Sequence, residues 1–386
     1  MSISIPFARP WLTDEDRAAV DRVLQGHVLT HGPECEAFEH EFADFLGEDV
    51  HCVTVSSCMA ALHLAYLDLG IGPGDEVVVA AQTHVATAHA VEWVGARPVF
   101  ADCDPATGNV TAQTIADAIT TRTRAIGLVH FLGIPCDMDA ILDLAEAGGL
   151  PVVEDCALAV GARYSGRHVG TAGHAGTFSF YPVKHLTTAE GGMFVTPDAD
   201  VAARVRRLRA FGVDRGHAER RTPGVYDVPT LGLNYRMSEL QAALGRTQLG
   251  RAPEILARRG DNFRRVGRPL LDAGLRVLDT QDERAQSAHY ALSVVLPGGA
   301  GGPRERVVQA LGEAGVGTSL YYPHPVPRLS YYRERYGYVD GFHPHAEEIS
   351  DASVTLPVGP HLAGGEAERV AATVVALAEV HVGAIA

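Results

Sequence analysis

The sequence predicts an α/β protein whose main sheet is covered by helices on both faces. Segments such as Val77-Val78-Val79 and Val152-Val153 are short apolar runs rather than alternating patterns, which is typical of strands buried on both sides. These runs alternate with helical patterns between residues 51 and 155. Glycines punctuate the joins between the predicted elements: Gly70, Gly72, Gly74, Gly95, Gly148 and Gly149.

The N-terminal segment, residues 1–12, is predicted to be an extended arm, because its two central prolines exclude a helix. Thr13 and Asp16 have the spacing of a capping box, so the first helix is expected to begin there. A second helix is expected to open at Pro33 and to end at Gly47.

The strand and helix patterns that follow are clear enough to give boundaries. Strands are predicted at 51–55, 76–80, 97–101, 124–130 and 151–155, and helices at 59–69, 84–94, 111–119 and 138–147.

We expect two domains, since 386 residues with 46% hydrophobic content are enough for more than one core. The predicted domains are a large α/β domain with its N-terminal arm over residues 1–250 and a smaller C-terminal α+β domain over residues 251–386. A long helical section is predicted from about 236 to 273. Beyond it the pattern predicts a strand near 288–296 and helices near 303–314 and 363–380.

Composition excludes several classes of function. The net charge is −15 and no basic block is present, which disfavours nucleic-acid binding. The six cysteines form no CxxC pair and are expected to be reduced core residues. No HExxH motif occurs, and the closest histidine pair, His343 and His345, flanks a proline, so no metal site is expected. The absence of a signal peptide and of a spanning apolar run predicts a cytoplasmic protein that does not enter a membrane.

The segment 176–192, GTFSFYPVKHLTTAEGG, is the most informative in the chain. Residues 177–181 read as a strand, and Pro182 ends it because proline has no N–H to donate. Lys184 follows, and it is the only lysine among the 32 basic residues. A lysine can be deprotonated by its surroundings and can form a Schiff base, whereas an arginine cannot.

An acidic residue is expected near this lysine. The predicted strand 151–155 ends in Glu154-Asp155, and ligands of open α/β sheets bind outside the carboxyl ends of the strands. Taken alone, such an acid is equally consistent with a structural helix cap. Together with Lys184 it has the composition of a pyridoxal phosphate site, in which a lysine holds the aldehyde as an imine and an acid keeps the pyridine nitrogen protonated.

Such a cofactor also needs a phosphate site and a group against its ring. Ser57, Cys58 and Met59 lie between a predicted strand and a helix, where free N–H groups favour a phosphate. His84 begins a helix at another strand end and is a candidate to lie against the ring. Ser179 is a second phosphate candidate. The alternatives are that the serine is an N-cap and that the histidine is a partly buried cap.

Several motifs together resemble one family over about residues 5 to 360. They are VTVSSCMAALHLAY, VHFLGIPCDM, VVEDCALAVGARYSGRHVGTAGHAGTFSFYPVKHLTTAEGGMFVT and LGLNYRMSELQAALGRTQL. In this order they resemble the DegT-type nucleotide-sugar aminotransferases, which are fold-type I pyridoxal phosphate enzymes. The resemblance implies a large mixed-sheet α/β domain followed by a smaller C-terminal domain.

The resemblance also implies roles for individual residues. Lys184 matches the lysine that forms the Schiff base and moves a proton during transamination, and Asp155 matches the acid that pairs with the pyridine nitrogen. Asn234 matches an asparagine that reaches the phosphate of a neighbouring subunit, which implies a homodimer with shared active sites. The other implied cofactor-binding residues are Ser57, Cys58, Met59, His84 and Ser179, and candidates for the substrate pocket are Tyr181, His185, Tyr321, Tyr322 and His324.

The chain departs from the family pattern at three places. Cys58-Met59 stand where the family has Gly-Thr, so backbone N–H groups would replace a hydroxyl at the phosphate. Leu158 replaces a glutamine that bonds the cofactor's phenolic oxygen. Ala189 replaces a glycine in a tight turn.

The implied reaction moves an amino group from glutamate or glutamine to a keto-sugar, expected to be a nucleotide-linked deoxysugar. Arg215, Arg236 and Arg328 are candidates to bind the diphosphate. Open alternatives are an aminocyclitol aminotransferase or a sugar dehydratase, although relatives that dehydrate carry histidine in place of Lys184. A non-catalytic regulator and a nucleotide-dependent dehydrogenase are disfavoured, because Lys184 is present and no GxGxxG follows a strand.

Overall fold

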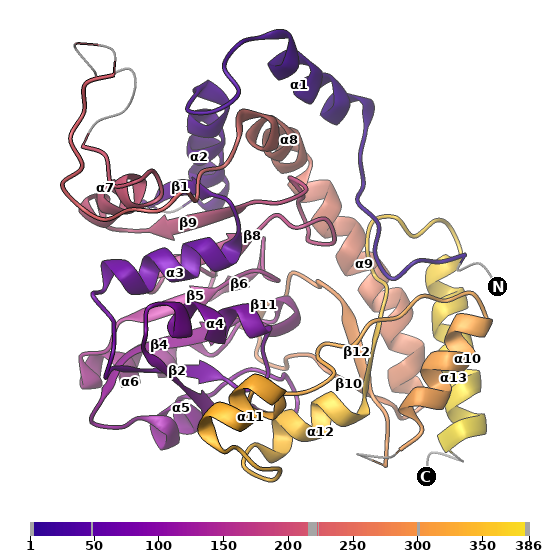
Figure 1. The fold of residues 1–386 in the computed structure, drawn as a ribbon. Coiled ribbons are helices and arrows are strands. Elements are labelled where there is room, and N and C mark those ends of the chain that lie inside the picture. The colour runs from indigo at the N-terminus through magenta and orange to yellow at the C-terminus, as the bar shows by residue number, and fades with distance from the viewer. Residues whose placement is uncertain (1–3, 48, 215–221, 223, 299–301, 383–386) are drawn as a thin grey trace.

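The structure is a computed structural model, and it describes residues 4–47, 49–214, 222, 224–298 and 302–382. A seven-stranded sheet forms its centre, in the order β1–β9–β8–β5–β4–β2–β3 (Figure 1). The strands are β1 (His51–Val55), β2 (Glu76–Ala80), β3 (Arg97–Ala101), β4 (Thr123–Val129), β5 (Val152–Asp155), β8 (Ala175–Ser179) and β9 (Gly192–Thr196). The mixed-sheet α/β fold that the sequence predicted is therefore confirmed.

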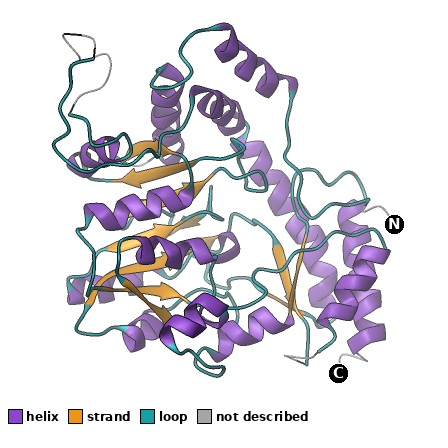
Figure 2. Ribbon diagram, in the orientation of Figure 1, coloured by secondary structure: helices purple, strands orange, loops and turns teal. Residues whose placement is uncertain are grey.

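Strands β8, β5, β4, β2 and β3 are parallel to one another, and β9 is antiparallel to both of its neighbours, β8 and β1. Strand β1 consequently runs in the same direction as β8. Every residue of β2, β5, β8 and β9 is buried, as expected for strands between two layers of helices (Figure 2).

Helices follow most of the parallel strands. They are α3 (Cys58–Asp68) after β1, α4 (Val85–Trp93) after β2, α5 (Ala112–Ala118) after β3 and α6 (Met138–Gly148) after β4. Helices α1 (Asp14–Gln25) and α2 (Pro33–Leu46) precede the first strand, and α7 (Ala199–Leu208) follows β9. Helix α3 packs against β9, β8 and β5. It is apolar around its whole circumference and buries every residue from 60 to 66, which is the pattern of a helix enclosed in a core.

The predicted start of α1 is confirmed, because the Thr13 and Asp16 side chains form a capping box. The long helical section predicted at about 236–273 forms two helices, α8 (Glu239–Gly250) and α9 (Ala252–Asp272), which meet at Arg251. Pro253 lies in the first turn of α9, where the N–H that proline lacks has no partner within the helix, so it suits a helix that begins there.

A second, smaller sheet lies beside α9. It contains β10 (Arg276–Val277), β12 (Leu292–Val295) and β13 (Ser353–Leu356), and α10 (Arg304–Glu313) and α13 (Glu366–Val382) pack around it. A separate apolar core joins these elements to α9. Ile5 of the N-terminal arm belongs to this core and pairs with Val316, so the arm crosses to the C-terminal part of the chain (Figure 1).

Part of the chain between β12 and β13 returns to the larger apolar core, which surrounds the seven-stranded sheet. It includes α11 (Ser330–Tyr336) and α12 (Pro344–Ala352), whose Tyr332 and Ile349 are buried in that core. The domain boundary at 250/251 remains a prediction. Helices α11 and α12 lie beyond it in the sequence but pack on the core around the main sheet. The remaining elements are β6 (Arg163–Tyr164), β7 (Arg167–His168), β11 (Ala285–Gln286) and the short 3₁₀ helices η1 (Phe131–Gly133) and η2 (Val326–Arg328).

Within the described residues, no helix combines the length and the apolar character that crossing a membrane requires.

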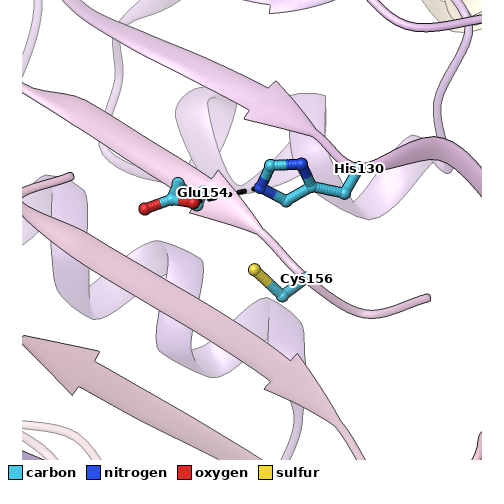
Figure 3. A group of neighbouring side chains, drawn as sticks. All are labelled: His130, Glu154 and Cys156. Carbon is cyan, nitrogen blue, oxygen red and sulfur yellow. Dashed lines mark hydrogen bonds and ion pairs between the residues drawn. The ribbon is translucent and has the colours of Figure 1, made fainter. Parts of the chain in front are cut away.

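The fully buried Glu154 carboxylate ties β5 to the loop that precedes β8. It accepts hydrogen bonds from the N–H groups of Gly170, Ala172 and Gly173, at 2.7–3.0 Å, and His130 Nε2 lies 3.0 Å from it (Figure 3). Burial raises the pKa of Glu154, but the bonds from His130 and the loop outweigh it and hold that pKa below its usual value. Glu154 is therefore a structural anion that fixes the position of its neighbour Asp155.

The substitution Glu154→Gln is expected to lower the free energy of unfolding by about 3 kcal/mol, because a buried NH₂ group would then face backbone N–H donors. Urea denaturation of the cofactor-free protein measures this loss. The same change at the exposed Glu146 on α6 is the control and should cost less than about 0.5 kcal/mol. Equal losses at the two positions would contradict the anchoring role.

Candidate active site

The carboxyl ends of the parallel strands meet at one edge of the main sheet, and four predicted site residues lie there. Asp155 is the last residue of β5, and Ser179 is the last residue of β8. Ser57 comes shortly after β1, and His84 comes shortly after β2. Since parallel strands point their carboxyl ends in one direction, the topology brings together residues that are far apart in the sequence.

The Asp155 carboxylate is buried and surrounded by donors. Thr87 Oγ1 donates to its Oδ2 at 2.8 Å, and the Ala157 N–H donates to its Oδ1 at 3.0 Å. The Cys58 thiol lies 3.7 Å from Oδ1. Thr83 Oγ1 is 2.8 Å from Thr87 Oγ1, so Thr83 donates to Thr87 while Thr87 donates to the acid. This shell fixes the orientation of Asp155 and offers donors only, which suits an ionised carboxylate.

Lys184 lies in the loop after β8, where its N–H bonds the Tyr181 carbonyl at 2.9 Å. Its Nζ is 5.1 Å from the centre of the Tyr290 ring. Burial lowers the pKa of Lys184 to about 8, although nearby Cys58 and Asp155 act in the opposite direction. The amine is thus much easier to deprotonate than that of an ordinary lysine, and it stands close to Asp155, as the sequence predicted.

His84 caps α4, since its Nδ1 accepts the Ala86 N–H at 3.2 Å, and its ring centre lies 5.6 Å from that of Tyr322. Partial burial of the ring and the charge of Lys184 lower the pKa of His84. His84 therefore is a helix cap, as the alternative interpretation proposed, and it also lies close enough to Lys184 for that charge to affect its pKa.

The N-terminus of α3 forms the candidate phosphate site. Ser57 is the N-cap, and its side chain accepts the Ala60 N–H at 3.1 Å. This cap does not use the N–H groups of Cys58 and Met59, which come before Ala60 in the helix. Gly192 of β9 packs so closely that a Cβ there would lie 2.7 Å from the Cys58 nitrogen. Backbone N–H groups therefore remain as donors where the family pattern has a threonine hydroxyl.

Ser179 and Asn234 flank this turn. Ser179 is buried, and its Oγ accepts the Tyr181 N–H at 3.4 Å. Asn234 is exposed, and the segment that carries it is tied to the turn because the Ser56 N–H donates to the Tyr235 carbonyl at 2.8 Å.

The candidate substrate residues occupy different environments. The Tyr321 hydroxyl bonds that of Tyr290 at 2.6 Å, while Tyr181 and His324 are exposed. His185 is buried and its Nε2 bonds the Ala288 carbonyl at 2.9 Å, which places it behind Lys184 in the interior.

The arginines proposed for the diphosphate also differ. Arg215 lies outside the described residues. Arg328 pairs with three carboxylates, of Asp340, Glu347 and Asp351, and is already neutralised. Arg236 contacts the ring of Phe211 and remains the better candidate.

One group within the described residues has the composition of a metal site: His130, Glu154 and Cys156 (Figure 3). Its ligand atoms are already used. His130 Nδ1 accepts the Cys136 N–H at 3.1 Å, so its Nε2 carries the proton that goes to Glu154, whose two oxygens also bind the loop amides. Burial raises the pKa of the Cys156 thiol far above its ordinary value, which opposes the thiolate that a metal requires.

Sequence reasoning missed Thr87 and Tyr290, which touch Asp155 and Lys184. Thr87 stands one helical turn after Thr83 at a strand end, a spacing that places both hydroxyls on one face and was available as a signal. Tyr290 has no local signal, because it reaches Lys184 from a segment more than 100 residues away.

Two departures from the family pattern can be placed. Leu158 is buried and its aliphatic side chain has no donor. Ala189 adopts a left-handed backbone with φ of +67°, which a glycine would adopt without strain.

The arrangement fits pyridoxal phosphate. That cofactor requires an amine that is readily deprotonated, a fixed anionic acceptor for its ring nitrogen and donors for its phosphate. Lys184, Asp155 and the start of α3 supply these three groups at one edge of the sheet.

Comparisons with known proteins agree with this fit. The model of the DegT/DnrJ/EryC1/StrS aminotransferase family matches residues 10–375. The chain is similar to Spr1654 of Streptococcus pneumoniae, a candidate sugar aminotransferase solved in its PMP-form, with 27% identity, a TM-score of 0.93 and coverage of 98% of this chain and 100% of that one. Spr1654 has also been solved in a PLP-form.

Two further solved structures have higher identity. The chain is 36% identical to DesV of S. venezuelae, with a TM-score of 0.88 and coverage of 97% of this chain and 99% of that one. It is 34% identical to the aminotransferase TlmJ of Streptoalloteichus hindustanus, with a TM-score of 0.89 and the same coverage. The chain therefore belongs to the DegT/DnrJ/EryC1/StrS aminotransferase family, and it is an aminotransferase that depends on pyridoxal phosphate.

Proposed function

We propose that the enzyme moves an amino group from glutamate or glutamine to a keto-sugar carried on a nucleotide. The observation that supports this most directly is that Lys184 lies near Asp155 at the carboxyl edge of the sheet. Lys184 is the only lysine of the chain, and Asp155 accepts hydrogen bonds from the groups around it. Bound pyridoxal phosphate supplies an aldehyde that captures amines and a ring that withdraws electrons from the carbon next to them.

Lys184 has two roles. Its Nζ would hold the cofactor, and as a free amine Lys184 would accept and return the proton that transamination moves. A pKa of about 8 suits both roles, because a base works best when its pKa lies near the working pH.

Asp155 would hold the ring nitrogen of the cofactor in its protonated form, which would make the ring a better electron acceptor. Thr87 is a positioning residue for this acid. Its hydroxyl donates to Oδ2 and the Ala157 N–H donates to Oδ1, so the two bonds fix the orientation of the carboxylate.

The phosphate would be held by the amides of Cys58 and Met59, by Ser57 and Ser179, and by Asn234 of the partner subunit in a homodimer. The dimer is supported by the surroundings of Asn234, since Leu231 is 92% exposed and Val225 and Val228 nearby are also exposed. An apolar group of this kind favours burial against a second subunit. His84 would lie against the ring of the cofactor.

A sugar acceptor is supported by the similarity to Spr1654, a candidate sugar aminotransferase, and to PseC of Helicobacter pylori, an aminotransferase of pseudoaminic acid biosynthesis that is 25% identical. Tyr181, His185, Tyr321 and His324 are the residues that we expect to contribute to its pocket, and the resemblance of the motifs suggests a nucleotide-linked deoxysugar.

Purified wild-type protein is expected to show the visible absorbance of bound cofactor, and glutamate should remove that band and release 2-oxoglutarate. Lys184→Ala should neither show the lysine-bound band nor turn over, because no other lysine exists to replace it. A nucleotide-linked keto-sugar added afterwards should restore the wild-type band. A protein that takes up no pyridoxal phosphate would disprove the proposal.

Thr87→Val removes one hydroxyl at nearly constant volume. We expect the rate of the glutamate half-reaction to fall about 10- to 100-fold, the effect of losing one hydrogen bond to a charged group, while the cofactor stays bound. The pH at which the visible band changes should also shift, and Thr87→Ser should restore both properties. A purely structural threonine would leave the spectrum unchanged.

In the cofactor-free protein, the reactivity of Lys184 towards an amine reagent should rise with pH and reach half its maximum near pH 8. In urea the midpoint should move towards 10.5. The folded pKa is below the unfolded one, so this group makes stability rise with pH between about 8 and 10.5, and Lys184→Met should abolish that rise. Peptide mass spectrometry separates Lys184 from the terminal amine, and a midpoint near 10.5 in the folded protein would contradict the lowered pKa.

A further inference from the structure

Tyr290 presents its aromatic ring to the amine of Lys184. The ring centre lies 5.1 Å from Lys184 Nζ, a distance at which the negative face of an aromatic ring attracts an ammonium group. Tyr290 is 3% exposed, and such an attraction is strongest where water is excluded. The ring is therefore placed to stabilise the charged form of this amine.

Hydrogen bonds fix the Tyr290 ring and the backbone that carries it. The Tyr290 hydroxyl bonds that of Tyr321 at 2.6 Å. The Tyr290 N–H donates to the Leu132 carbonyl at 3.1 Å, and the Tyr290 carbonyl accepts from Arg259 Nη1 at 2.7 Å. The residue is thus anchored at its backbone and at its hydroxyl, and moving the ring away from Lys184 would break the bond to Tyr321.

His185 ties this segment to the loop of Lys184. Its Nε2 donates to the carbonyl of Ala288 at 2.9 Å, and its ring centre lies 5.6 Å from that of Tyr290. Burial lowers the pKa of His185 far below its ordinary value, so the ring is neutral and carries its proton on Nε2 for this bond. Since His185 directly follows Lys184 in the chain, the bond holds the two segments together next to the amine.

The charges around Tyr290 favour an aromatic ring over an aliphatic side chain. Arg259 Cζ lies 5.8 Å from the same ring centre, and Arg259 is itself buried. Burial lowers the pKa of Arg259 to about 10, so the guanidinium is still charged at pH 7. Two cations that lie near one another repel, and the negative face of the ring offsets part of this cost. An aliphatic residue would fill the space but would attract neither cation.

Other titratable groups face Lys184 from the elements packed against it. They are Cys58 of α3, Asp155 of β5, His84 before α4 and His185 of its own loop. Asp155 attracts the ammonium group, whereas burial raises the pKa of the Cys58 thiol well above its ordinary value and keeps it uncharged. Burial lowers the pKa values of both histidines, which are therefore neutral at pH 7. In the proposed function the cofactor engages Asp155, and the Tyr290 ring then remains to attract the free amine.

We propose that Tyr290 is a positioning residue for Lys184, and that the charged amine rests on the face of the Tyr290 ring whenever it is not bonded to the cofactor. The inference deepens the proposed function and rests on it, since there the amine leaves the cofactor and returns to it. The stem of a lysine is flexible, so the ring limits the positions that Nζ explores and keeps the amine at the carboxyl edge of the sheet.

The first experiment varies the electrons of the ring at nearly constant shape. Tyr290 is replaced by phenylalanine or by phenylalanines that carry one, two or three fluorines, which are introduced by amber suppression. In the cofactor-free protein, the pH at which Lys184 reaches half its maximal reactivity towards an amine reagent should stay near 8 in Tyr290→Phe. It should fall with each fluorine, by about one pH unit in total, because a weaker negative face stabilises the ammonium group less.

The same replacements at Tyr332 are the matched control. Tyr332 is fully buried in the same apolar core, where its ring packs against those of His89 and Phe100. Its fluorinated variants should leave the midpoint of Lys184 unchanged. An unchanged midpoint across the Tyr290 series, or an equal fall in the Tyr332 series, would overturn the inference.

The loaded enzyme gives a second readout. In Tyr290→Leu the maximal rate of the glutamate half-reaction should fall about 10-fold, while the half-saturating glutamate concentration stays unchanged, since the ring positions the amine and does not bind the donor. Tyr290→Phe should keep the wild-type rate, and a change in the half-saturating concentration alone would contradict the positioning role. If wild type reacts with neither glutamate nor glutamine, the proposed function fails, whereas the midpoint series still tests the contact, so the two failures are distinguishable.

Discussion

The alternation of side chains along β5 is the constraint on which the site depends. Glu154 and Asp155 are adjacent, and neighbouring residues of a strand point to opposite faces of the sheet. Glu154 is held by His130 and by the 170–173 loop, whereas Asp155 is held by Thr87 at the start of α4 and meets Cys58 of α3. Glu154 thus has a structural role, and it fixes the strand that carries Asp155, the acid of the proposed site.

The site combines charges that water does not screen. Lys184 is largely withdrawn from solvent, Asp155 is buried, and Arg259 is buried behind Tyr290. In such surroundings each charge acts strongly on its neighbours, and an uncompensated one is unfavourable.

The departures from the family pattern acquire a physical meaning in this setting. Cys58 directs its thiol towards Asp155 and Thr177, not towards the phosphate turn. It therefore fills space beside the acid, and burial raises the pKa of its thiol well above the ordinary value, so the thiol stays neutral there. Leu158 is buried without a donor, which leaves the tuning of the cofactor to Asp155 and to the groups that hold it.

The sequence by itself determined the strand–helix alternation, the strands of the parallel sheet to within one or two residues and the pair Lys184 and Asp155, because apolar runs, turn glycines and strand-end residues are local signals. It did not place the junction of α8 and α9 at Arg251 within the long helical section. Only the tertiary structure decided that Thr87 holds Asp155, that Tyr290 lies between Lys184 and Arg259, and that Glu154 is an anchor. The reason is that these contacts join segments from 16 to more than 100 residues apart, and their partners are chosen by packing, on which local sequence patterns carry no information.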